Sequence, residues 1–196
     1  MKKRYLLLIP TLLAIFCVSS CGGSENIVTS KDTGSELTST IDTSLSECVF
    51  TSFAAQDFNG KAVNQSIFSD HKVTMINVWA TWCKPCVTEM PYLAKLHKKY
   101  QESGFQVIGV ALDCVDINYN KDYEKFNTAK QIIAETQANY THLLPSKSMK
   151  NFIDGIETVP QTIFVNEEGY LVGNVYKGIR TESEWETLIT TFLELL

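Results

Sequence analysis

Apolar positions along the chain form strand-like runs and helical stripes that alternate from about residue 73 onward. The run at 73–80 is apolar at nearly every position, a pattern typical of a strand that is covered on both faces. Residues 87–100 place their apolar side chains on one side of a helix, and Gly104 ends it. A second apolar run at 105–112 then predicts a strand parallel to the first, joined to it by a right-handed crossover.

The second half of the chain contains further helical and extended patterns. In order, they predict a loop at 113–121, a helix at 122–139, a short extended piece at 141–144, and an antiparallel hairpin with strands at 161–165 and 170–176. Thr181 and Glu184 have the spacing of a capping box, which predicts that a final helix begins there. This order of elements predicts an α/β fold with a central mixed sheet and helices on both faces.

The N-terminal residues 1–20 have the organisation of a secretory signal peptide. Three basic residues at 2–4 precede an apolar stretch at 5–18, which is too short and too interrupted to be a good membrane span. The sequence at 18–21, Val-Ser-Ser-Cys, resembles a bacterial lipobox, and this implies cleavage before Cys21 and a diacylglyceryl group on its sulfur. Two acyl chains on one residue give stable anchoring. The alternative is a plain signal peptide followed by a coincidental cysteine.

Residues 21–47 are rich in Gly, Ser, Thr and acidic side chains, and they show no sustained hydrophobic period. Such a composition predicts a flexible tether with an r.m.s. span of roughly 25–30 Å. The remaining residues, 48–196, have the length of one ordinary domain. The chain is therefore predicted to consist of a lipoprotein signal peptide at 1–20, a lipid-anchored tether at 21–47 and a single domain at 48–196.

The charge of the chain argues against nucleic acid as a partner. The full sequence has 17 Lys and Arg against 22 Asp and Glu, a net charge of −5. Removal of residues 1–20 takes away three basic residues and no acidic ones, so the processed chain has 14 against 22, a net charge of −8. Neither a nucleic acid nor an anionic membrane surface attracts such a protein electrostatically.

Four of the six cysteines remain available for disulfide chemistry after processing. Cys17 leaves with the signal peptide and Cys21 carries the lipid, which leaves Cys48, Cys83, Cys86 and Cys114. Four cysteines allow three connectivities. Cys83 and Cys86 are close by their spacing, and Cys48 and Cys114 then form a candidate second disulfide in an oxidising compartment. Two inert thiols or a second redox relay are the alternatives.

The Cys-Lys-Pro-Cys segment at 83–86 lies where the first predicted strand passes into the first helix. Cys83 falls at or next to the helix N-cap, where unpaired backbone amides and the macrodipole favour a thiolate, and Lys84 adds a positive charge nearby. Cys86 lies deeper in the first turn and can resolve a mixed disulfide formed at Cys83. A zinc site would normally need two further ligands at similar spacing, and the chain has no second CxxC. The pair therefore predicts thiol–disulfide exchange, with no metal and no cofactor besides the Cys83–Cys86 disulfide.

The stretch at 79–91, Trp-Ala-Thr-Trp-Cys-Lys-Pro-Cys-Val-Thr-Glu-Met-Pro, resembles the TlpA/ResA-like branch of the thioredoxin superfamily. The resemblance covers roughly residues 50–196 and includes Thr-Val-Pro at 158–160 and an inserted segment before that proline. It implies a thioredoxin-like fold, a single domain with an insertion before the cis-proline hairpin. It also implies that Pro160 is cis and packs opposite the two cysteines, and that Val159 contacts the substrate. A plain turn proline is the alternative.

Two positions distinguish branches of this superfamily. Thioredoxin itself has a buried acid six residues before the first cysteine, where this chain has Asn77. The resemblance implies that Glu89, three residues after Cys86, serves in proton transfer, and the chemistry is coherent because the resolving thiol must lose its proton. A solvated acid in the first helical turn is the alternative interpretation of Glu89.

The tryptophans and histidines receive different interpretations. Trp82 is expected to lie exposed beside the disulfide as a contact surface for substrate, whereas Trp79 and Trp185 fit positions in the core. The histidines show no pairing with one another or with a cysteine. We interpret all three histidines as surface or capping residues without a role: His71, His97 and His142.

The resemblance implies a reductase of protein disulfides on the extracytoplasmic face of the bacterial cell membrane. Such proteins receive electrons from a membrane thiol donor of the CcdA/DsbD type and reduce the cysteines of apocytochrome c or of methionine sulfoxide reductases. The expected form is a lipid-anchored monomer that binds no nucleic acid. The Lys-Pro pair between the cysteines does not fix the reduction potential, so a dithiol oxidase for envelope proteins is an alternative.

Two further alternatives lie outside protein-disulfide exchange. A peroxidase of the peroxiredoxin type would need a Pro-x-x-x-Thr/Ser-x-x-Cys loop, and the residues before Cys83 contain no such proline. A non-enzymatic lipoprotein that holds a soft metal on Cys83 and Cys86 would carry copper or zinc when purified under reducing conditions.

Overall fold

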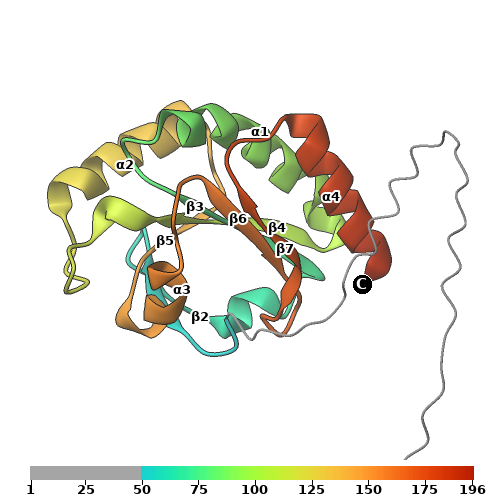
Figure 1. Ribbon diagram of the computed structural model, residues 1–196, viewed down its shortest axis with the longest axis horizontal. Coiled ribbons are helices and arrows are strands. Elements are labelled where there is room, and N and C mark those ends of the chain that lie inside the picture. Colours follow the sequence, from blue (N-terminus) through green and yellow to red (C-terminus); the bar gives the residue numbers. More distant parts are fainter. Residues whose placement is uncertain (1–49) are drawn as a thin grey trace, which may run out of the picture. The chain divides into compact units, whose positions relative to one another are not determined.

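A mixed sheet runs through the part of the chain that the structure describes, residues 50–196 of a computed structural model (Figure 1). Its seven strands follow the order β2-β1-β5-β4-β3-β6-β7. They are β1 (Ala54–Asp57), β2 (Ala62–Asn64), β3 (Val73–Trp79), β4 (Phe105–Ala111), β5 (Thr141–Leu144), β6 (Gln161–Val165) and β7 (Leu171–Lys177). The central pairs β3–β4 and β4–β5 are parallel, and the other pairs are antiparallel. The predicted mixed sheet and the parallel pair at its centre are confirmed.

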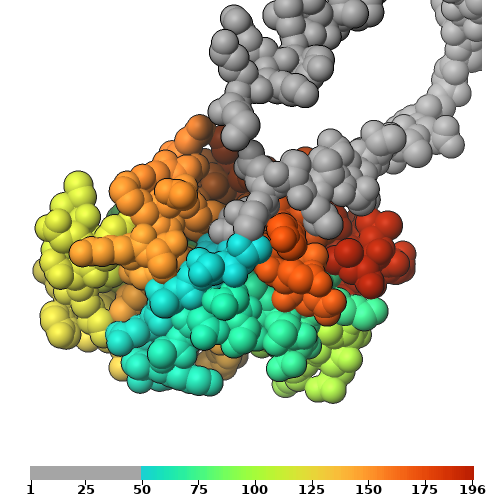
Figure 2. Space-filling view, turned by 90° about the horizontal axis from the view of Figure 1, so that it is seen from below, coloured from blue at the N-terminus to red at the C-terminus, as the bar shows by residue number. Residues whose placement is uncertain are grey.

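Helices cover both faces of this sheet. Within residues 50–196 they are α1 (Lys84–Tyr100), α2 (Tyr123–Glu135), α3 (Lys150–Asp154) and α4 (Glu182–Leu195). Helices α1, α2 and α4 join one buried cluster and arch over one side of the sheet in Figure 1. Helix α3 and the 3-10 helix η1 (Gln65–Phe68) pack into a second cluster on the other face. Figure 2 views this second face from below, with the cyan start of the described chain beside the orange segment that contains α3.

Strand β3 contributes side chains to both clusters. All of its residues are buried, as are all those of β4, which confirms the prediction of strands covered on both faces. Val73, Met75 and Trp79 belong to the cluster beneath α1, whereas Ile76 and Val78 belong to the opposite cluster, as the two-residue period of a strand requires. Because its side chains join both clusters, β3 lies at the centre of the core. Full burial of each such side chain contributes about 1.5–3 kcal/mol to the stability of the fold.

One predicted helix boundary is confirmed and another differs. Helix α1 begins at Lys84, directly after its N-cap Cys83 as expected, although its apolar pattern is visible only from residue 87. Helix α2 ends at Glu135 rather than at residue 139, and Gln137 then adopts a left-handed backbone conformation (φ 54°) that an α-helix cannot contain. Tyr140 directly precedes β5 and is buried there.

The C-terminal elements match their prediction closely. Strands β6 and β7 pair antiparallel as the predicted hairpin. The Thr181 side chain accepts from the backbone N–H of Glu184, and the Glu184 side chain accepts from the backbone N–H of Thr181, so the capping box that starts α4 is confirmed. The hydrophobic pattern did not predict β1, β2 or α3. The fold class is nevertheless the one expected, a thioredoxin-like α/β domain.

Several sequence predictions concern residues that precede the described range. The signal peptide at 1–20, the tether at 21–47, the lipidated Cys21 and the thiol of Cys48 all lie there. Within residues 50–196, no helix is both long enough and apolar enough to cross a membrane. The boundaries of the signal peptide and tether, and the lipid anchor, therefore stay predictions.

His142 is buried within the sheet, so its interpretation as a surface or capping residue is wrong. Its Nε2–H donates to the carbonyl oxygen of Ala138 (3.0 Å), and its Nδ1 accepts from the indole Nε1–H of Trp79 (3.2 Å). Burial lowers the pKa of His142 to about 4, so the ring is neutral at neutral pH. On β5 it lies opposite Gly109 of β4, and the imidazole fills the space that a side chain at Gly109 would need.

Replacement of Gly109 by alanine should therefore destabilise the fold. An added Cβ would lie 2.3 Å from His142 Nδ1, and the ring is fixed by its two hydrogen bonds. We expect Gly109→Ala to lower the free energy of unfolding by about 1–3 kcal/mol in urea denaturation. Gly155→Ala is the control, because its φ is −82° and an added Cβ would be 3.4 Å from the nearest atom. Equal losses in the two variants would contradict this packing argument.

Candidate active site

The two cysteines of the CxxC segment lie where β3 leads into α1. They form a disulfide with 5.3 Å between their Cα atoms. Cys83 is the N-cap of α1, with extended backbone dihedrals (φ −84°, ψ 91°), and its Sγ accepts a hydrogen bond from the backbone N–H of Cys86 (3.2 Å). The predicted position at the helix N-terminus is thus confirmed. An N–H donor and the positive end of the helix dipole both favour the thiolate of Cys83 over its thiol.

The disulfide is shielded from solvent, whereas the residue next to it is not. Cys83 and Cys86 have only 2% and 1% of their surface exposed, so exposure does not distinguish the two thiols. Trp82 is 66% exposed, as the sequence predicted. A large apolar side chain exposed directly beside a reactive group is a natural contact for a bound segment of another protein.

A second loop is bonded to the residues just before the cysteines. Asp113 lies in the 3-10 helix η3 (Leu112–Cys114) that follows β4. Its carboxylate accepts from the backbone N–H of Thr81 (3.0 Å) and from the Thr81 hydroxyl (2.6 Å). Because β3 and β4 are parallel and paired up to their last residues, the loops that follow them meet at the same edge of the sheet. Asp113 is not among the predicted site residues, although it directly follows a predicted strand.

Glu89 is fully buried in α1, with none of its surface exposed, so the alternative of a solvated acid is wrong. Its Oε1 accepts a hydrogen bond from the indole Nε1–H of Trp185, and its Oε2 has no partner among the described residues. Burial raises the pKa of Glu89 to about 7, while hydrogen bonds from Trp185 and the backbone of Arg180 and the charge of Arg180 act in the opposite direction. A carboxyl group with this pKa can both accept and release a proton near neutral pH.

Trp185 was expected in the core, and it is fully buried there. The sequence analysis did not anticipate its bond to Glu89. The helical period of α4 indicates only which side of the helix is buried, and it carries no information about which polar atom the indole N–H meets. Trp79 is also fully buried, as expected.

The peptide bond between Val159 and Pro160 is cis, so the alternative of a plain turn proline is wrong. Pro160 is buried at the start of β6, and its carbonyl oxygen accepts from the backbone N–H of Gly178 (2.9 Å). Val159 is half-buried and packs against the core cluster that contains Cys83 and Cys86.

Cys114 is a fully buried thiol with no disulfide partner among residues 50–196. Its expected partner, Cys48, lies outside the described residues. Burial, together with the charge of Asp113, raises the pKa of Cys114 to about 12. A thiol that stays protonated at neutral pH is a poor nucleophile, and the pairing of Cys48 with Cys114 stays a prediction.

The described residues contain no group of three or more His, Cys, Asp and Glu side chains that could hold a metal ion. His97 accepts a hydrogen bond from the backbone N–H of Val107 (3.1 Å), which is a structural contact between α1 and β4.

Comparisons with known proteins agree with this geometry. Residues 47–173 match the AhpC/TSA family. Thiol-disulfide oxidoreductase ResA of Bacillus thuringiensis subsp. konkukian is 30% identical over 138 residues, which are 68% of this chain and 70% of that protein. ResA of Geobacillus thermodenitrificans is 25% identical over 186 residues, which are 94% of each chain.

Solved structures show the same fold. A thiol:disulfide interchange protein of the thioredoxin family from Chlorobium tepidum has a TM-score of 0.59 at 23% identity, and the match covers 72% of this chain and 93% of that one. Thiol–disulfide exchange is the chemistry indicated by the names of these relatives and by the Cys83–Cys86 disulfide at a helix N-terminus of a thioredoxin-like fold. The chain belongs to the AhpC/TSA family of thioredoxin-fold proteins and is a thiol-disulfide oxidoreductase similar to ResA.

Proposed function

We propose that this protein reduces protein disulfides on the extracytoplasmic face of the bacterial cell membrane, where a lipid on Cys21 anchors it as a monomer. The observation that carries the proposal is Cys83 at the N-cap of α1, paired with Cys86. The signal-peptide and lipobox pattern at 1–21 supports the location. Relatives named thiol-disulfide oxidoreductase ResA support the type of reaction.

In the proposed cycle, the reduced protein gives two electrons to a substrate disulfide. The Cys83 thiolate attacks one sulfur of that disulfide, the substrate S–S bond breaks, and the departing thiolate takes a proton from solvent. Cys86 loses its proton to the Glu89 carboxylate, and the Cys86 thiolate attacks Cys83 Sγ. The second substrate thiolate leaves with the proton that Glu89 returns, and the protein is left with its Cys83–Cys86 disulfide.

Substrate contact is proposed for the residues around the disulfide. Trp82 offers an exposed indole beside it, and Val159 lies before the cis-proline Pro160 and packs against the core cluster that includes both cysteines. An extended segment that carries a disulfide, such as the haem-binding cysteines of apocytochrome c or the cysteines of a methionine sulfoxide reductase, suits such a surface. A membrane dithiol donor of the CcdA/DsbD type then returns the protein to its reduced form by the reverse exchange.

The reduction potential of the Cys83–Cys86 couple tests the direction of this cycle. We expect the purified protein, equilibrated against glutathione and dithiothreitol buffers, to have a potential of ~−270 mV or lower, the range of thioredoxin. Such a dithiol is a good electron donor and needs a membrane partner to reduce it. A potential near ~−120 mV would instead identify an oxidase that inserts disulfides, and the proposed direction would be wrong.

A further inference from the structure

The segment that joins β7 to α4 contacts two separate parts of the active site. The backbone N–H of Gly178 donates to the carbonyl oxygen of Pro160 (2.9 Å), and the backbone of Arg180 lies near the Glu89 carboxylate and lowers its pKa. Thr181 follows directly and caps α4. One short segment therefore links the cis-proline, the buried acid and the start of the last helix.

Trp185 is held in a fixed position against Glu89. Its indole is fully buried and packs edge-on against the ring of Tyr176, with 5.8 Å between ring centroids. The Nε1–H donates to Glu89 Oε1. Because an indole N–H can only donate, this contact favours the ionised carboxylate over the neutral acid.

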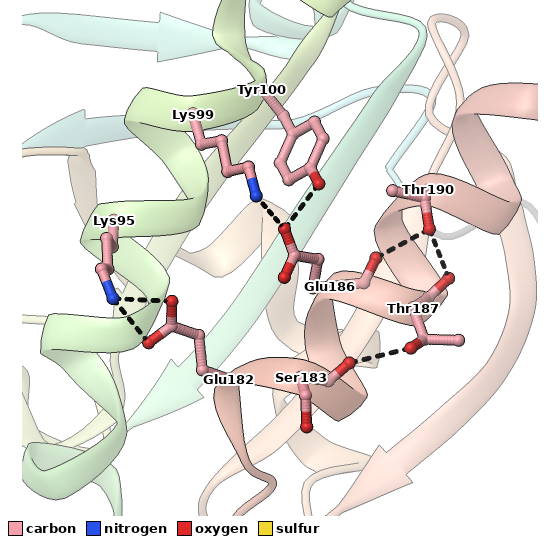
Figure 3. A network of polar contacts seen from close by, with 8 residues as sticks. All are labelled: Lys95, Lys99, Tyr100, Glu182, Ser183, Glu186, Thr187 and Thr190. Carbon is pink, nitrogen blue, oxygen red and sulfur yellow. Dashed lines mark hydrogen bonds and ion pairs between the residues drawn. The ribbon is translucent and has the colours of Figure 1, made fainter.

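Two ion pairs join α4 to α1 (Figure 3). They are Lys95–Glu182 (2.9 Å) and Lys99–Glu186, and the Tyr100 hydroxyl also donates to Glu186. Exposed ion pairs of this kind contribute little to global stability. Glu182 and Glu186 lie three residues before and one residue after Trp185, so the pairs join the two helices in the same turns of α4 that carry the buried indole.

Arg180 lies beside the same group. Its guanidinium is 4.8 Å from the ring centroid of Tyr176 and 5.1 Å from that of Trp185, so two aromatic rings restrict it. Arg180 Nη1 and Glu89 Oε2 are both buried, and neither has a hydrogen-bond partner among residues 50–196. A buried cationic donor and a buried carboxylate oxygen that both lack a partner are complementary in charge and in hydrogen bonding.

We propose that Trp185 and Arg180 are positioning residues for Glu89, in which the indole N–H holds Oε1 and the guanidinium is the counter-ion of Oε2 once the carboxylate ionises. The proposal rests on the proposed role of Glu89 as proton acceptor from Cys86. Trp185 and Arg180 act through Glu89, because they favour its ionised form in a site that is closed to water.

The other titratable groups near Glu89 do not provide a counter-charge. Tyr140, just before β5, is buried, and burial raises its pKa, as does the charge of Glu89. Burial also raises the pKa of Tyr176 on β7. Both phenols are neutral at neutral pH, and Cys86 on α1 is the proton donor itself. Arg180 is therefore the cation whose charge favours ionised Glu89.

Loss of either contact should make Glu89 harder to ionise. Trp185→Phe removes the N–H but keeps an aromatic ring, and Arg180→Met removes the charge but keeps a long side chain. We expect each to raise the pKa of Glu89, so that the rate of mixed-disulfide resolution reaches its half-maximum at a pH higher by about one unit. Arg180→Lys should restore most of the wild-type pH profile, because it restores a cation.

The experiment combines two measurements on the purified protein. The first is a ¹³C NMR titration of labelled glutamate carboxyl groups, in which Glu89→Gln identifies the Glu89 signal. The second is the rate of mixed-disulfide resolution against pH, by rapid mixing with a disulfide peptide. Trp79→Phe is the matched control for Trp185, since it removes another buried indole that bonds to His142. Lys177→Met is the matched control for Arg180, since Lys177 pairs with exposed Glu157.

The NMR titration decides the proposal. A higher pKa of Glu89 in Trp185→Phe and Arg180→Met, with no such change in the two controls, supports it. An unchanged Glu89 titration in both variants overturns it, even if they resolve mixed disulfides slowly. Failure of the proposed function looks different: Glu89→Gln would then resolve mixed disulfides at the wild-type rate at every pH, whatever the titration shows.

Discussion

Cys83→Ser is expected to abolish thiol–disulfide exchange, whereas Cys86→Ser should capture the substrate as a stable mixed disulfide. Only Cys83 has its sulfur at the N-cap of α1 with a backbone N–H donated to it, so it is the sulfur that attacks first. Without Cys86, no thiol is placed to break the bond that Cys83 forms. A disulfide peptide and intact-protein mass spectrometry would show an added peptide mass on Cys86→Ser and none on Cys83→Ser.

Cys114→Ser is the matched control for both cysteine variants. Its thiol is buried and its pKa is raised to about 12, so it should not exchange, and the variant should keep wild-type turnover. A peptide captured on Cys83→Ser but not on Cys86→Ser would reverse the roles assigned to the two cysteines. Loss of turnover in a folded Cys114→Ser protein would instead point to a relay through the third thiol.

Glu89→Gln should change how the stability of the oxidised protein depends on pH. The pKa of Glu89 is raised from 4.5 to about 7 by burial, so folding favours its neutral form. This contribution is fully present below pH 4.5 and is lost as the pH rises to about 7, a loss of about 3 kcal/mol in the free energy of unfolding. Glutamine cannot ionise, so Glu89→Gln should not lose this contribution. In urea denaturation, the difference in free energy of unfolding between the variant and the wild type should therefore be larger at pH 8 than at pH 4.5, by about 3 kcal/mol in favour of the variant.

The comparison of the two proteins isolates Glu89 from other groups. His142, whose buried ring has a pKa lowered to about 4, destabilises both proteins equally as the pH falls from 6.5. Glu102→Gln provides a control at an exposed acid, and its stability should follow the wild type at each pH. Parallel curves for Glu89→Gln and the wild type would show that Glu89 ionises as readily in the folded protein as in the unfolded chain.

The sequence predicted those parts of the fold whose local pattern is strong. Strands β3 and β4 are buried on both faces and therefore appear as continuous apolar runs, and the capping box of α4 is a local signal. Strands β1 and β2 each bury a single residue, and the five residues of α3 bury none. Elements this short and this exposed show no hydrophobic periodicity, so the sequence did not predict them.

The active site was predictable only as far as its motif extends. Cys83, Cys86 and Glu89 lie within seven residues, and the resemblance carried by that stretch located all three. The contacts that set the environment of Glu89 come from Trp185 and Arg180, more than 90 residues later in the chain. Such contacts depend on how α4 packs against α1, which no local pattern records.

The last helix also decides when the site becomes complete during synthesis. Trp185 follows Glu89 by 96 residues along the chain, so the cysteine motif is synthesised well before α4. Until α4 packs against α1 through its buried side chains, Glu89 lacks the indole N–H from which its carboxylate accepts a hydrogen bond. The cysteines and the acid are thus made early and together, but the contacts that lower the pKa of that acid form only when the last part of the chain has folded.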